Sequence, residues 1–164
     1  MDTARKPAKA IPASALLRLD KQLCFALYST SLTMTKLYKP VLERLGLTYP
    51  QYLVMLVLWE SAPLTVSELG ARLFLDSGTL TPLLKRMQAS GWLLRDRDAE
   101  DERRVIVSLS DAGRALRQQA SGVPREVACA TQCSLDELAD LTQRLQTLRS
   151  NIAAHLISPP DAAA

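Results

Sequence analysis

Residues 65–109 read TVSELGARLFLDSGTLTPLLKRMQASGWLLRDRDAEDERRVIVSL, and this stretch decides the fold. The segment 65–68, TVSE, is a capping box that predicts the start of a short helix. Either Asp76 or Ser77 can cap a second helix, which Gly91 stops. Two short helices joined by a tight turn have the spacing of a helix-turn-helix.

The second of these helices has two faces with different chemistry. Its apolar residues recur at i, i+3, i+4 and i+7 and predict a buried face made of Leu80, Leu83, Leu84 and Met87. Small polar groups and cations occupy the opposite side. A face of this kind can enter the major groove of DNA and reach base edges and phosphates. The candidate DNA-contacting residues on this helix are Ser77, Thr79, Thr81, Pro82, Lys85 and Arg86.

Two short β segments follow, at residues 92–95 and 105–109, and every residue of the loop between them except Ala99 is charged. A hairpin with a charged tip directly after a helix-turn-helix is typical of the wing of a winged helix. Arginines at such a tip suit the narrow minor groove, where the potential is most negative. We expect Arg103 to enter this groove, with Asp101 bracing it. The candidate residues of the wing are Arg95, Arg97, Asp101, Arg103 and Arg104.

Upstream, two helices are predicted. An apolar stripe with spacings of three, four or seven predicts a long helix over 14–45, which Pro40 should kink or end and Gly46 should close. A second capping box at 48–51 predicts a nearly apolar helix to about Trp59. The expected buried stripe of the long helix consists of Leu23, Leu27, Met34, Leu37, Val41 and Leu45.

Downstream of the wing, one helix is predicted to about Ala130, and a capping box at 134–137 predicts another after it. The last helix carries a leucine stripe that is too long for a small DNA-binding core to cover. A second copy of the chain is the simplest cover, so we expect a homodimer. The stripe consists of Leu138, Leu141, Leu145, Leu148, Ile152 and Leu156.

The expected organisation is a single domain over 14–157, mainly α with a small β wing. The helices at 14–45 and 111–157 would make the dimer, and residues 48–109 would bind DNA. Residues 1–13 are expected to form a flexible basic tail and residues 158–164 a loose one.

Composition argues against a membrane-spanning or a secreted protein. The 164 residues are 48% hydrophobic, enough for the core of one domain, yet the longest apolar run is far too short to span a bilayer. A basic N-terminus without an apolar segment behind it is no secretory signal, so we expect a cytoplasmic protein without a membrane partner. Residues 76–104 carry six Lys/Arg and six Asp/Glu, so the DNA-binding prediction rests on pattern and not on net charge.

The cysteines and the histidine argue against structural disulfides and a metal site. Three cysteines, an odd number, do not suit a structural disulfide framework, and any disulfide would be transient and linked to redox state. Cys129 and Cys133 have no neighbouring histidine and no second cysteine pair, so we expect no metal and no other cofactor.

The order of these elements resembles MarR-type winged-helix regulators over about residues 14–157. The segments 91–95, 101–104 and 109–113 are similar to the wing and exit signature of that family. Residues 23–28, LCFALY, resemble the reactive-cysteine segment of its organic hydroperoxide-sensing, OhrR-type branch.

The resemblance assigns roles to five residues. It implies that Cys24 is the redox-sensing thiol and that Tyr38 and Tyr49 donate hydrogen bonds to its thiolate, with Tyr28 nearby. It also implies that Cys129 is the resolving cysteine of a two-cysteine branch.

Helix geometry supplies an independent argument for a dimer. In a continuous helix, Cys24 and Tyr38 are separated by about 21 Å along the axis and cannot touch within one chain. They can touch if two such helices run antiparallel across a two-fold axis. Tyr28 follows Cys24 by four residues and shares its helix face.

The implied function is that of a transcriptional repressor and not an enzyme. The reduced homodimer would bind a near-palindromic double-stranded DNA operator. An organic hydroperoxide, the inducer, would oxidise Cys24 to a sulfenic acid. A disulfide with Cys129 of the partner subunit would follow, and release of the operator would derepress a peroxide-detoxification gene.

Alternatives remain open at this point. A MarR-type repressor could respond to a small aromatic or lipophilic ligand, with Cys24 used only for packing. A thiol peroxidase would need a cation to activate the thiolate, and none is visible in the sequence. Tyr38 and Tyr49 could pack at a dimer interface, and Lys85 and Arg86 could be solvated surface charges.

Overall fold

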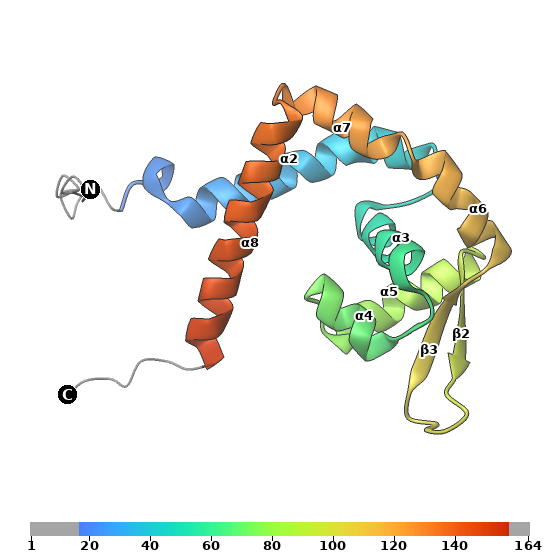
Figure 1. Ribbon diagram of the computed structural model, residues 1–164. Coiled ribbons are helices and arrows are strands. Elements are labelled where there is room, and N and C mark those ends of the chain that lie inside the picture. The colour runs from blue at the N-terminus through green and yellow to red at the C-terminus, as the bar shows by residue number, and fades with distance from the viewer. Residues whose placement is uncertain (1–16, 158–164) are drawn as a thin grey trace, which may run out of the picture. The chain divides into compact units, whose positions relative to one another are not determined.

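The computed structural model describes residues 17–157, which form a series of helices and one small sheet (Figure 1). The chain divides into two compact units, one up to Leu53 and one from Val54 onward. The tails expected at 1–13 and 158–164 lie outside the described residues. Within the described residues, no helix is both long enough and apolar enough to cross a membrane.

The first unit contains the 3-10 turn η1 (Leu19–Lys21), the helix α2 (Leu23–Glu43) and the first residues of α3 (Tyr49–Ser61). The long helix was expected from about Ser14 but begins at Leu23, because Gln22 is extended at φ −86 and ψ 116. Pro40, expected to kink or end the helix, lies inside it and does not end it. Gly46 closes the segment at φ 67, as expected.

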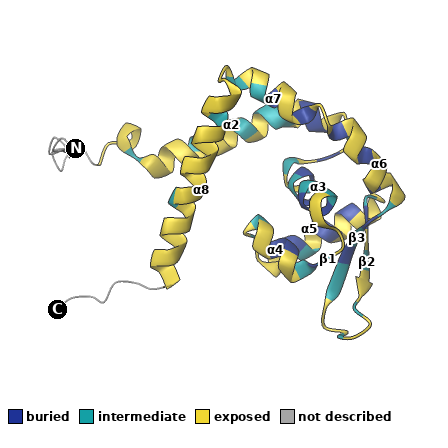
Figure 2. Ribbon diagram, in the orientation of Figure 1, coloured by how far each residue is buried: buried dark blue, intermediate teal, exposed yellow. Residues whose placement is uncertain are grey.

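The apolar stripe of α2 is only partly covered in the single chain. Val41 is buried near the C-terminal end, whereas Leu23 is 58% exposed and Leu27 is also exposed (Figure 2). The expectation of one continuous buried stripe is therefore wrong for the N-terminal half of the helix. Among the described residues of α2, only Val41 and Leu42, near its C-terminal end, are buried.

The helix α3 begins at the expected box, where Gln51 Oε1 accepts a hydrogen bond of 2.8 Å from the backbone N–H of Thr48. Further along, Met55 and Leu58 are fully buried, as the apolar sequence predicted. The indole Nε1 of Trp59 donates to the carbonyl of Gly113 at 2.9 Å and ties α3 to α6 (Asp111–Ala120).

The helix-turn-helix consists of α4 (Val66–Leu73) and α5 (Ser77–Ala89). Both halves of the capping box between Thr65 and Glu68 are present. Asp76 is the N-cap of α5, with its carboxylate accepting the Thr79 N–H at 2.8 Å, which decides between the two candidate caps. The predicted buried face of α5 is confirmed at Leu80, Leu83, Leu84 and Met87.

The sheet contains β1 (Leu64–Thr65), β2 (Leu93–Arg97) and β3 (Val105–Leu109), in the antiparallel order β1-β3-β2. The last strand has its predicted bounds, and the other hairpin strand lies slightly later than residues 92–95. The sequence did not predict β1, because two residues are too few to show an alternating pattern. The hairpin with its charged loop is the wing.

Beyond the wing, the single helix expected to about Ala130 is two helices, α6 and α7 (Val123–Thr131). Pro124 lies in the first turn of α7 and has no N–H to continue the hydrogen bonds of α6. The break at 121–122 follows from this.

The last helix, α8 (Leu135–Ile157), begins at the predicted capping box, where Ser134 and Glu137 bond to each other's backbone N–H. None of the described residues of α8 is buried (Figure 2). Leu141 and Ile152 of its leucine stripe are each 52% exposed. The described residues therefore leave the stripe without a buried member, in agreement with the prediction that a small DNA-binding core does not cover it.

Candidate functional site

A cavity of about 620 Å³ lies between the helix-turn-helix and the wing. Five of the expected DNA-contacting residues line it, from α5, β2 and the wing loop: Ser77, Thr81, Arg95, Arg103 and Arg104. The end of β1 and the starts of α4 and β3 contribute residues that the sequence did not assign to DNA contact: Thr65, Val66, Ser67, Glu68 and Val105. The fold therefore brings the two predicted parts of the DNA-binding face together around one concave surface.

Arg95 is the most unusual side chain of this cavity. It is half-buried on β2, and its Nε is buried with no hydrogen-bond partner among the described residues. Buried polar groups in folded proteins nearly always have a partner. The Arg95 guanidinium lines the cavity and has an unused hydrogen-bonding capacity, so it is suited to bind an anionic oxygen from outside the chain, such as that of a phosphate.

The wing tip is held by its own carboxylates. Asp101 Oδ1 accepts the backbone N–H of Arg103 at 3.0 Å and lies 3.5 Å from its Nε, while the Arg103 side chain is 95% exposed. Arg104 Nε lies 3.6 Å from Asp98 Oδ2 in the same loop. The contact expected between Asp101 and Arg103 is therefore present, and it presents the guanidinium to solvent.

Two further carboxylates lie beside the cavity as charged caps. Bonds from the backbone and side chain of Thr79 lower the pKa of Asp76, and bonds from Thr65 lower the pKa of Glu68. The Thr79 hydroxyl donates to Asp76 Oδ2 at 2.8 Å, so this candidate DNA contact is engaged in the cap. The other candidate residues are exposed on α5 or at the end of β2: Pro82, Lys85, Arg86 and Arg97.

The thiol site is spread along the first unit. Cys24 is an exposed free thiol in the first turn of α2, and Tyr28, one turn later, is 61% exposed. Tyr38 lies much further along the same unbroken helix, about 21 Å from Cys24 along the axis. The single chain therefore does not bring Cys24 and Tyr38 together.

Tyr38 instead lies against Tyr49, with ring centroids 4.7 Å apart, and both are half-buried. Burial, followed by the neighbouring hydroxyls of Tyr49 and Tyr52, raises the pKa of Tyr38 to about 12. Burial also raises the pKa of Tyr49. At neutral pH these phenols are protonated and can donate hydrogen bonds. Tyr52 belongs to the same cluster and was missed, because it lies inside an apolar helix.

The other two cysteines lie near the end of α7. Cys129 is an exposed free thiol in its last turn, and Cys133 is an exposed free thiol just beyond it. The Cys133 Sγ donates to the carbonyl of Thr131 at 3.5 Å.

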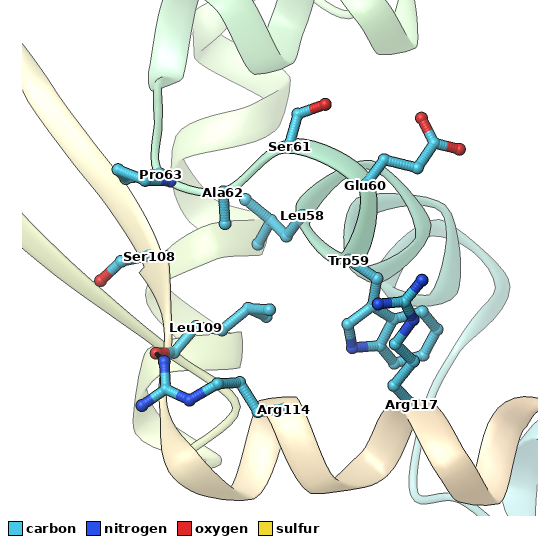
Figure 3. A pocket seen from close by; sticks show the side chains of 10 residues that line it. All are labelled: Leu58, Trp59, Glu60, Ser61, Ala62, Pro63, Ser108, Leu109, Arg114 and Arg117. Carbon is cyan, nitrogen blue, oxygen red and sulfur yellow. Dashed lines mark hydrogen bonds between the residues drawn. The ribbon is translucent and has the colours of Figure 1, made fainter.

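A second cavity of about 410 Å³ lies beside α6 (Figure 3). Leu58, Trp59 and Leu109 supply apolar walls, and Arg114 and Arg117 project from α6 along its edge. The Arg114 guanidinium already donates to the Leu109 carbonyl and to Asp111, each at 2.6 Å. Glu60, also at this cavity, pairs with Arg72 of α4.

One contact connects the last helix to the helix-turn-helix. The Arg149 guanidinium of α8 lies over the ring of Phe74, 4.2 Å from its centroid. Phe74 is the C-cap of α4 and has φ 56, a left-handed conformation that few bulky residues adopt. The contact therefore fixes α8 against the turn between α4 and α5.

The buried face of α5, the capped turn and the arginine-bearing hairpin together define a winged helix-turn-helix protein. A family model for the transcriptional regulator SarA/Rot matches residues 36–119. The organic hydroperoxide resistance transcriptional regulator of Bacillus subtilis is 48% identical over 132 residues, which cover 80% of this chain and 90% of that protein.

Solved structures agree. AbfR of Staphylococcus epidermidis matches with a TM-score of 0.67 and 39% identity, over 85% of this chain and 97% of that chain. A MarR mutant from Escherichia coli in complex with operator DNA matches with a TM-score of 0.67 and 27% identity, over 77% and 92% of the two chains. The chain belongs to the MarR family of winged-helix transcriptional regulators and is of the organic hydroperoxide resistance type. The relatives are transcriptional regulators, in agreement with the expectation of a regulator and not an enzyme.

Proposed function

We propose that the protein is a homodimeric repressor that holds a near-palindromic DNA operator when reduced and releases it when an organic hydroperoxide oxidises Cys24. One observation carries this proposal. Cys24 is exposed on a helix whose apolar face is uncovered, far from the tyrosines that would bond to its thiolate. A second copy of the chain would cover that face and supply those tyrosines.

Two uncovered apolar faces support the dimer, one in each unit of the chain. On α2, Leu23 and Leu27 are exposed, and on α8 the same holds for Leu141 and Ile152. Contiguous apolar surface of this kind on a water-soluble protein usually marks an interface. A two-fold axis would place two copies of α5 about one helical turn of DNA apart, roughly 10 bp.

On each half-site, α5 would lie in the major groove. Ser77 and Thr81 at its start would meet bases or phosphates, and Lys85 and Arg86 would hold phosphates. Arg103 would enter the minor groove, and the Arg95 guanidinium, which lines the cavity, would bind a phosphate. The relative AbfR has been solved in its reduced form bound to DNA, which supports this role for the fold.

The thiol chemistry proceeds in two balanced steps. The Cys24 thiolate attacks the terminal oxygen of the hydroperoxide, so an S–O bond forms and the O–O bond breaks. The alkoxide leaves as the alcohol after it takes up the proton that the thiol has lost. The thiol of Cys129 of the partner subunit then attacks the sulfenic sulfur, so a disulfide forms and water leaves. Tyr38 and Tyr49 of the partner subunit would donate hydrogen bonds to the thiolate and lower its pKa.

Release of DNA would follow from the second step. A disulfide at Cys129 pulls on α7, which the break at 121–122 separates from α6 and the wing. The two α5 helices would then lose the spacing that the operator requires. AbfR has also been solved in a disulfide-formed state, which supports such a step in a relative.

The test is a gel shift with DNA upstream of the protein's own gene, before and after one equivalent of an alkyl hydroperoxide. The wild type is expected to release the DNA and to rebind it after thiol reductant, whereas Cys24→Ser stays bound. Cys133→Ser serves as the matched control and is expected to respond like the wild type. If the Cys24→Ser protein releases DNA as readily as the wild type, the redox mechanism is wrong.

A second candidate function uses the cavity beside α6. Its apolar walls and the exposed Arg117 would suit a small lipophilic anion, and binding there would shift the wing through β3. DNA release by such a ligand that persists in Cys24→Ser, and that Arg117→Ala weakens, would favour this function over the redox one.

A further inference from the structure

A third tyrosine completes the cluster around Tyr38. Tyr52 is only 2% exposed, and its ring centroid lies 5.9 Å from that of Tyr38 at an interplanar angle of 39°. The distance falls within the range of favourable aromatic pairs. The side chain is therefore a fixed and buried neighbour of a residue that the proposed function places at the thiol.

The arrangement follows from helix spacing. Tyr49 and Tyr52 are three residues apart on α3 and so share one face of that helix, and both rings lie against Tyr38 of α2. The ring of Tyr38 thus contacts two others, one half-buried and one fully buried. Without the buried ring, one side of Tyr38 would face an empty volume into which it could rotate.

We infer that Tyr52 is a positioning residue of the thiol site, whose ring fixes Tyr38 so that its hydroxyl points at the Cys24 thiolate of the partner subunit. This inference rests on the proposed function. We assign this task to the ring because the rings of Tyr52 and Tyr38 lie in tilted contact, and Tyr52→Phe tests the hydroxyl separately. A hydrogen bond weakens steeply as its geometry departs from linear, so a mobile Tyr38 would stabilise the thiolate less.

The experiment measures how fast Cys24 is oxidised by cumene hydroperoxide in the reduced full-length protein, as a function of pH. Sulfenic acid is trapped with dimedone and quantified on the peptide that carries Cys24. In Tyr52→Leu the midpoint of the pH–rate profile is expected to move upward by about one pH unit, which lowers the rate about tenfold at pH values well below the midpoint. Tyr52→Phe, which keeps the ring, is expected to stay within about twofold of the wild type.

Two controls separate positioning from general destabilisation. Leu47→Ala opens a cavity at another buried residue of the same unit, and it is expected to lower thermal stability while leaving the pH profile unchanged. Tyr52→Met keeps most of the side-chain volume without an aromatic ring, and it replaces Tyr52→Leu if circular dichroism shows that the leucine variant is unfolded.

The outcomes distinguish failure of the role inferred for Tyr52 from failure of the proposed function. Tyr38→Phe is expected to move the midpoint of the pH–rate profile upward, and adding Tyr52→Leu to it should cause little further change. If Tyr38→Phe has its effect and Tyr52→Leu and Tyr52→Met have none, the inference is wrong and the proposed function stands. Equal damage from Tyr52→Phe and Tyr52→Leu also overturns it. If Tyr38→Phe itself changes nothing, the tyrosine part of the proposed function fails as well.

Discussion

At the scale of single residues, Tyr38 offers a direct test of the packing of α2 against α3. Burial and the hydroxyls of Tyr49 and Tyr52 raise its pKa to about 12, above that of an unfolded chain near 10. A raised pKa favours the protonated form, so this stabilisation is complete below pH 10 and is lost as pH rises through 12. Ultraviolet titration should therefore show one tyrosine that ionises last, and Tyr38→Phe should remove that step. A single step for all four tyrosines at the ordinary pKa would contradict the packing.

Arg95 leads to a second prediction at this scale. If its guanidinium binds a DNA phosphate, Arg95→Gln should weaken DNA binding at least about tenfold, to a similar degree for specific and unrelated sequences. The slope of log K against log salt should fall by about one. Arg117→Gln removes the same charge from an exposed position on α6 and should leave the slope unchanged. A normal slope in Arg95→Gln would show that this guanidinium does not reach a phosphate.

The sequence predicted which face of a helix is buried better than it predicted the interactions of individual side chains. The buried face of α5 follows from its period, but the choice between Asp76 and Ser77 as its cap stayed open because either can accept the bond. Thr79 was a candidate for DNA contact, and period alone cannot reveal that its hydroxyl donates to Asp76. Tyr52 was missed because an aromatic residue in an apolar helix looks like ordinary core.

At the scale of elements, Gly113 controls how α6 leaves the sheet. A Cβ atom built there would lie 2.0 Å from the backbone oxygen of Trp92 and 3.3 Å from the Leu109 side chain. Gly113→Ala must therefore displace backbone and should cost about 2–3 kcal/mol of unfolding free energy or more, measured by urea denaturation at fixed protein concentration.

Gly122 is the matched control for this substitution. No described atom lies within 4 Å of a Cβ built at Gly122, and its φ of −82 suits any residue. Gly122→Ala should therefore change the free energy of unfolding by no more than about 0.5 kcal/mol. If the two variants are equally stable, the close approach of α6 to Trp92 is wrong.

The contact between Phe74 and Arg149 joins two elements that are far apart in the sequence. In a double-mutant cycle of Phe74→Ala and Arg149→Ala, we expect a coupling of about 0.5–1 kcal/mol in the free energy of unfolding. Arg144→Ala, which removes an exposed arginine paired with Asp140 on the same helix, should show no coupling to Phe74→Ala. Zero coupling for Arg149 would mean that α8 does not rest on the turn.

Element boundaries were predictable where a side chain marks them chemically. The N-terminal caps of α3, α4 and α8 all lie where the sequence placed them, because each depends only on residues three positions apart. The strand β1 depends instead on pairing with β3, more than forty residues later, and no local pattern announces it. The division of α6 from α7 was missed, although Pro124 marks it.

At the scale of the whole molecule, the uncovered leucine stripe of α8 predicts that the dimer depends on it. Leu141→Glu combined with Ile152→Glu should produce a monomer in sedimentation experiments and abolish operator binding, because buried unpaired carboxylates are costly. Gln143→Glu adds a charge to an exposed position of the same helix outside the stripe and should leave a dimer. A double variant that still sediments as a dimer would place the interface elsewhere.

The sequence could predict the winged helix-turn-helix and the need for a second copy, since both follow from periodicity and helix rise. It could not predict that α2 would be exposed over its first half, because periodicity shows that a face is apolar without showing what covers it. The same limit applies to Cys24, whose surroundings in a dimer depend on a surface that the single chain leaves open.

The balance of charge in the wing and α5 has a kinetic consequence. Asp98 and Asp101 hold the arginines of the tip, and residues 76–104 carry as many acids as bases. A DNA-binding segment without net charge is only weakly attracted to DNA of arbitrary sequence, since that attraction comes almost entirely from uncompensated cations. The protein would therefore spend little time sliding on foreign sequence. Once its fit to the operator is lost, it would dissociate from the DNA instead of remaining bound to neighbouring base pairs. Under the proposed function, the gene would then become accessible to RNA polymerase quickly.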